Sequence, residues 1–190
     1  MKLNLSSSKQ KQYIRRALLA LLVLFVAMVQ NVPWLVPIFG VSALPLIPLV
    51  VAIAVYDQGV PAVVLGAVAG AVWDVASPAH GLHAAYLAAI AFACSMLLRY
   101  IFNRNVLSMG LLSLLSTALY LLVRWFGDYA MLNSQSETGR VLSSAEIAWP
   151  LLRYSLPSLV YTMLLAPLCF WAVKTIVKKT SRRQREILAE

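Results

Sequence analysis

The sequence predicts an all-α integral membrane protein with about six transmembrane helices in one bundle. Of its 190 residues, 61% are hydrophobic and 12% are charged, whereas soluble domains average about 45–50% and about 25%. The apolar residues fall into runs close to the roughly 17–25 residues that a spanning helix needs. Sixteen Lys and Arg outnumber seven Asp and Glu, and they gather at the two ends of the chain. Cations beside apolar runs indicate membrane orientation and contact with lipid, so no nucleic-acid partner is expected.

The candidate spans follow one another with short connections. In chain order they are 17–37, 41–56, 60–76, 83–102, 106–126 and 150–177. The second and third are short and are separated by Asp57-Gln58-Gly59, and one helix of about 36 residues across both would overshoot a bilayer. The last run is too long for a straight crossing, and Pro157 and Pro167 predict a kink or a division there. Five spans is the main alternative to six.

The distribution of cations predicts that both termini lie in the cytoplasm. With the N-terminus inside, thirteen Lys and Arg lie on the cytoplasmic side and three, Arg124, Arg140 and Arg153, lie outside. The chain then divides into a basic N-terminus (1–16), a membrane domain (17–177) and a basic tail (178–190). The cations expected to contact anionic lipid are Arg15, Arg16, Lys178, Lys179, Arg182 and Arg183.

Two polar segments flank the last span. The sequence Ser143-Ser144-Ala145-Glu146 has the pattern of a capping box, so a helix is expected to begin there, with a plain loop as the alternative. The tail after Val173 is predicted either to continue as a basic helix on the cytoplasmic surface or to form a solvated anchor.

The third span carries the most informative pattern. Ala62, Gly66, Gly70 and Asp74 recur every four residues and therefore share one helix face. Small residues at this spacing let another backbone approach closely. Two interpretations are open: the face packs against a helix of the same chain, or it docks a helix of a partner protein.

Asp74 needs a partner. An ionisable side chain inside a span is costly, and the C-terminal end of a helix disfavours negative charge. Arg124 and Arg153 are expected at a similar depth, so we predict an ion pair of Asp74 with one of them. A hydrated Asp74 at the interface is the alternative. His80 and His83 lack the further ligands of a structural metal site, so two interfacial histidines and no metal are expected.

With these residues in place, the sequence resembles the rod shape-determining MreD family of bacterial membrane proteins. The resemblance rests on Pro45-Leu-Ile-Pro48, on Gly66-x-x-x-Gly70-x-x-x-Asp74, on Gly81 and on the alanine-rich span that follows. It covers residues 44–104, and the six-span plan extends it over the chain. It implies a non-enzymatic inner-membrane component of the cell-elongation machinery, with MreC, MreB filaments and the peptidoglycan polymerase and transpeptidase pair as partners. It also implies that Gly66, Gly70 and Asp74 shape the helical core or a docking face.

Three functions are therefore compared. A scaffold for peptidoglycan synthesis needs close-packing faces and basic ends. The family's likeness to the substrate-binding subunits of energy-coupling-factor transporters makes a small-molecule-binding subunit the alternative, with Asp74, His80, His83, Arg124 and Trp125 lining a pocket. An enzyme is not expected, because Asp57 and Asp74 lie at opposite membrane faces, roughly 25 Å apart along a helix. No cofactor is expected either.

Overall fold

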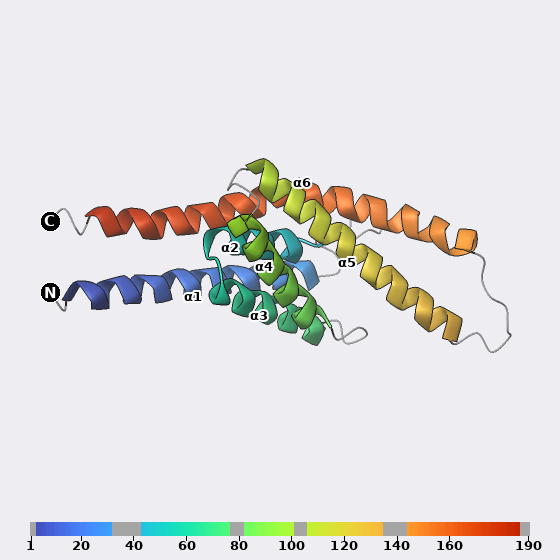
Figure 1. The fold of residues 1–190 in the computed structure, drawn as a ribbon, viewed down its shortest axis with the longest axis horizontal. Helices are drawn as coiled ribbons and strands as arrows, with labels where there is room; N and C mark the ends of the chain where they lie inside the picture. Colours follow the sequence, from blue (N-terminus) through green and yellow to red (C-terminus); the bar gives the residue numbers. More distant parts are fainter. Residues whose placement is uncertain (1–2, 32–42, 77–81, 101–105, 135–143, 187–190) are drawn as a thin grey trace.

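The computed structural model describes residues 3–31, 43–76, 82–100, 106–134 and 144–186, and every regular element in these ranges is an α-helix. The helices, shown in Figure 1, are α1 (Leu3–Asn31), α2 (Leu46–Tyr56), α3 (Val60–Ala76), α4 (His83–Tyr100), α5 (Val106–Ser134) and α6 (Ser144–Glu186). Each predicted span thus has a helix.

Four of these helices contain segments long and apolar enough to cross a membrane, and the chain is therefore a membrane protein. The segments are Gln12–Asn31, His83–Tyr100, Leu107–Gly127 and Ser155–Thr180. The other two apolar helices in the described ranges, α2 and α3, have 11 and 17 residues. At the helical rise of 1.5 Å, α2 is only about 16 Å long, roughly half the hydrocarbon thickness. The prediction that 41–56 forms a full span is therefore wrong.

The short helix α2 is the centre of the bundle. It packs on each of the other five helices, and every residue from Leu46 to Val55 is buried. A helix that is apolar on all sides is stable when other protein segments surround it. The apolar run that suggested a span is apolar because it forms the protein core.

The beginning of α2 lies within the bundle, where unpaired backbone N–H groups are costly. The N–H of Leu44 donates to Thr162 Oγ1 of α6 at 3.0 Å, and the N–H of Leu46 donates to Gln30 Oε1 of α1 at 3.2 Å. Pro48, in the first turn, has no N–H to satisfy. Side chains of the first and last helices thus tie down the start of the central one.

The last helix, α6, continues without a break through Pro157 and Pro167 for 43 residues, so these prolines do not divide the last span, and the kink that was the other possibility stays a prediction. Neighbouring helices and side chains can satisfy the backbone groups that a proline frees in a membrane helix. Its first residue is Ser144, where the capping pattern predicted a helix start, and it extends into the basic tail as far as Glu186. The beginning of α1 and the end of α6 lie at the same end of the molecule (Figure 1).

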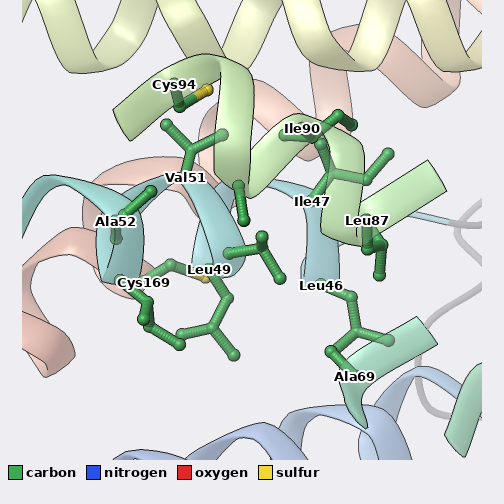
Figure 2. Packing of buried hydrophobic residues seen from close by; sticks show 14 of the residues in the cluster. Leu46, Ile47, Leu49, Val51, Ala52, Ala69, Leu87, Ile90, Cys94 and Cys169 are labelled. Carbon is green, nitrogen blue, oxygen red and sulfur yellow. The ribbon is translucent and has the colours of Figure 1, made fainter. Parts of the chain in front are cut away.

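The core forms where α2 meets its neighbours. In Figure 2, side chains of α2 lie among apolar side chains of α3, α4 and α6. Both cysteines, Cys94 and Cys169, are free and buried in this core, as their positions in apolar runs predicted. The residues labelled in the figure are Leu46, Ile47, Leu49, Val51, Ala52, Ala69, Leu87, Ile90, Cys94 and Cys169.

Candidate functional site

The face of α3 that carries the glycines packs against α4, and this is the most extensive helix contact of the bundle. A Cβ atom on Gly66 would lie 2.7 Å from the carbonyl oxygen of Leu87. A Cβ atom on Gly70 would overlap the backbone of His83 and Ala84. Only glycine permits this approach, because any side chain would push the two helices apart. The structure therefore selects internal packing for this face, the first of the two interpretations, because α4 covers the surface that the other interpretation assigned to a partner helix.

Asp74, near the C-terminal end of α3, caps the beginning of α4. Its Oδ1 accepts the backbone N–H of His83 at 2.9 Å, and its Oδ2 accepts the N–H of Ala84 at 3.0 Å. These are the first two residues of α4, whose N–H groups have no acceptor within the helix. The positive end of the α4 dipole also faces the carboxylate. The dipole at the C-terminal end of α3 disfavours the carboxylate charge, and the dipole at the N-terminal end of α4 compensates for this.

This contact corrects the partner predicted for Asp74. The structure places the carboxylate against α4, whereas Arg124 and Arg153 are exposed residues of α5 and α6. The prediction required a cation, but the N–H groups at the beginning of α4 supply hydrogen-bond donors without a full charge. The short connection between the two helices could have predicted the partner of Asp74, since it brings the end of α3 next to the beginning of α4.

His83 extends this contact to a third helix. Its Nδ1 lies 2.7 Å from Asp74 Oδ1, and its Nε2 lies 3.0 Å from Tyr120 Oη of α5. Since the carboxylate can only accept, Nδ1 carries a proton, and Nε2 of a neutral ring then accepts from the Tyr120 hydroxyl. The ring also stacks on Trp73, with centroids 4.3 Å apart. His83 is 6% exposed and is therefore buried between helices, whereas its predicted depth at the membrane interface stays a prediction; His80 lies outside the described residues.

A second carboxylate, Asp57, lies in the turn between α2 and α3 and is 6% exposed. Arg15 Nη2 of α1 is 2.6 Å from Asp57 Oδ1, and Arg16 Nε is 3.6 Å from Oδ2. Gly59 completes the turn with a φ of +86°, which favours glycine. Sequence reasoning missed this cluster because 42 residues separate Arg15 from Asp57.

The cations predicted to contact lipid therefore divide into two groups. Arg15 and Arg16 bind Asp57 and tie α1 to the α2–α3 turn. Lys178 and Lys179 are exposed on α6, and Arg182 and Arg183 lie in the last turns of the same helix.

The polar atoms of the Asp74 cluster are used by one another, whereas in the Asp57 cluster only the contact of Arg15 Nη2 with Asp57 Oδ1 is a hydrogen bond among the described residues. No group of three or more His, Cys, Asp and Glu that could hold a metal occurs among the residues with a described position. Asp57 and Asp74 lie at opposite ends of α3. Of the groups suggested for a ligand pocket, Asp74 and His83 already bond to each other and to backbone or Tyr120. Both clusters join helices, which is a structural role.

The chain matches no protein-family model, no curated protein and no solved structure. Its function is therefore inferred from the sequence pattern and from the geometry above.

Proposed function

We propose that this protein is a non-catalytic inner-membrane scaffold of the bacterial cell-elongation machinery, of the kind that the MreD family provides. The observation that carries the proposal is the convergence of the pattern residues on one structural unit. Gly66 and Gly70 let α3 touch α4, and Asp74 caps α4. These residues join α3 and α4 in a closely packed hairpin whose polar groups face inward. Such a hairpin supports the role of a scaffold that holds partner proteins in position.

The proposed setting is the bacterial cytoplasmic membrane, with both termini in the cytoplasm. The proposed partners are MreC and, through the complex, MreB filaments and the peptidoglycan polymerase and transpeptidase pair. Because α4 covers the glycine face, a partner helix would contact the outward faces of the hairpin. Val64 and Val68 of α3 and Phe92 and Met96 of α4 are exposed there, as lipid-facing or partner-facing side chains must be.

Depletion in a rod-shaped host that carries this gene tests the proposal. Cells should become round when the protein is depleted and should regain rod shape when the wild-type copy is expressed. Gly70→Leu should fail to restore shape, because its side chain meets the backbone of α4. Gly110→Leu is the matched control, since nothing lies within 4 Å of the position of its Cβ.

Copurification with MreC in detergent tests the same proposal biochemically. Gly70→Leu should lose the complex at membrane levels at which Gly110→Leu keeps it. Rod shape that persists after depletion would contradict the proposal, and a copurifying vitamin-sized ligand would favour the transporter subunit instead.

A further inference from the structure

One face of α6 is exposed from Val160 to Lys178. Its residues follow the spacing of a helix at 3.6 residues per turn, so they fall within about 80° of one another around the axis. We name this face the α6 outer stripe. Its exposed members are Val160, Leu164, Pro167, Trp171, Lys174 and Lys178.

The chemistry of the α6 outer stripe changes in one direction along the helix. Its first half is apolar, with Leu164 73% exposed. Trp171, 69% exposed, follows two turns later, and Lys174 and Lys178 occupy the next two turns. A helix that leaves a bilayer places apolar side chains among the acyl chains, aromatic side chains at the interface and cations at the headgroups. The stripe has its residues in this order. The six residues thus match the layers of one leaflet.

The cations of the stripe have no acidic neighbour in their own helix, because α6 contains no Asp or Glu between Glu146 and Glu186. The contrast with α1 is direct, since Arg15 and Arg16 of that helix bind Asp57. Arg15 and Arg16 thus pair with a carboxylate of the protein, whereas Lys174 and Lys178 are exposed.

We propose that the cationic end of the α6 outer stripe binds the headgroups of anionic phospholipids in the leaflet nearest the two termini, with Trp171 anchored at the interface. The long methylene stems of Lys174 and Lys178 can lie along the acyl region while their ammonium groups reach the phosphates. This inference depends on the membrane location of the chain and not on its role in cell elongation.

Lipid-specific quenching of Trp171 tests the proposal with the full chain. The protein is reconstituted in phosphatidylcholine vesicles that contain equal amounts of either brominated phosphatidylglycerol or brominated phosphatidylcholine, the bromines lying near the headgroup end of the acyl chain. The signal of Trp171 is the part of the quenching that Trp171→Phe removes. Brominated phosphatidylglycerol should quench this part more strongly, and high salt should reduce the difference.

Lys178→Gln should weaken the preference for phosphatidylglycerol about fivefold, which corresponds to about 1 kcal/mol for one surface cation. Arg99→Gln is the matched control, because Arg99 is an exposed cation in the last turn of α4 and lies off the stripe. It should leave the preference unchanged. Equal quenching by the two lipids in the wild type would overturn the proposal and favour an acidic protein as the partner of these lysines. An equal loss of the phosphatidylglycerol preference in Lys178→Gln and Arg99→Gln would also overturn the proposal, because any surface cation would then attract the lipid equally.

Discussion

The two ends of α3 each hold a carboxylate, and the structure satisfies them in different ways. At one end, Asp57 binds the guanidinium groups of Arg15 and Arg16 from α1. At the other end, Asp74 binds the first backbone N–H groups of α4 and the imidazole of His83. The Asp57 cluster depends on long, charged side chains from a distant part of the sequence, whereas the Asp74 cluster is built mainly on the backbone of the next helix.

This difference teaches that a carboxylate in a membrane bundle needs hydrogen-bond donors, and that a cation is only one source of them. The two carboxylates also contribute to stability in different ways, one through ion pairs and the other through hydrogen bonds to the backbone. Salt should weaken the ion pairs of Asp57, because the Arg16 side chain is 40% exposed and exposed charges are screened. The contacts of Asp74 with the backbone depend on the close packing of α3 and α4.

The largest effect is expected where the Asp74 end depends on glycine. Gly70→Ala places a Cβ atom against the backbone of His83 and Ala84, so the hairpin must open and the cap is lost. The expected cost is about 3 kcal/mol, at the upper end for overpacking, seen as a lower midpoint of thermal unfolding in detergent. Gly110→Ala, with open space around it, is the control and should be neutral or stabilising. Similar losses of stability in both variants would show that the close approach of α3 and α4 does not cause the loss.

Removal of the carboxylate is expected to have the next largest effect. Asp74→Ala leaves the N–H groups of His83 and Ala84 without their acceptor, at a cost of about 2 kcal/mol. Asp74→Asn keeps one acceptor oxygen and should lose less. The unfolding midpoints of the two variants measure this order, and an equal loss in both would mean that the charge, which both variants remove, matters more than the acceptor oxygen that Asn keeps.

The Asp57 end should show a smaller effect that depends on salt. Arg15→Gln should destabilise by about 1 kcal/mol, and Arg16→Gln by less, because Arg15 is closer to the carboxylate and less exposed. Unfolding is measured at about 0.1 M and about 1 M salt, over which the Debye length falls from about 10 Å to about 3 Å. The difference between wild type and Arg15→Gln should shrink at high salt, whereas the effect of Asp74→Ala should not change. An equal response of both ends would remove the distinction between them.

A small effect is also expected at Tyr120. Tyr120→Phe removes the hydroxyl that lies 3.0 Å from His83 Nε2 and keeps the ring beside Trp73 and Tyr86. One hydrogen bond of this type contributes about 1 kcal/mol, and the loss should appear in the unfolding midpoint. Combined with Asp74→Ala, it should add less than it does alone, because both variants act on His83. Full additivity would show that the two contacts of the ring are independent.

Much of the fold follows from the sequence because membrane insertion depends on local hydrophobicity. The apolar runs gave the positions of the helices, the capping pattern gave the beginning of α6 at Ser144, and the spacing of Gly66 and Gly70 gave a close-packed face. These features depend on residues near one another in the chain, where helix period and side-chain size are decisive.

Only the tertiary structure decided which surfaces and charges meet. The sequence could not tell a core helix from a lipid-facing one, so α2 looked like a span although other helices surround it. It could not assign the arginines either, because their partners depend on how distant helices lie side by side. The packing brings Arg15 to Asp57 across 42 residues and gives Asp74 the backbone of α4. Local hydrophobicity determines where the chain is helical, and the satisfaction of buried polar groups determines how the helices fit together.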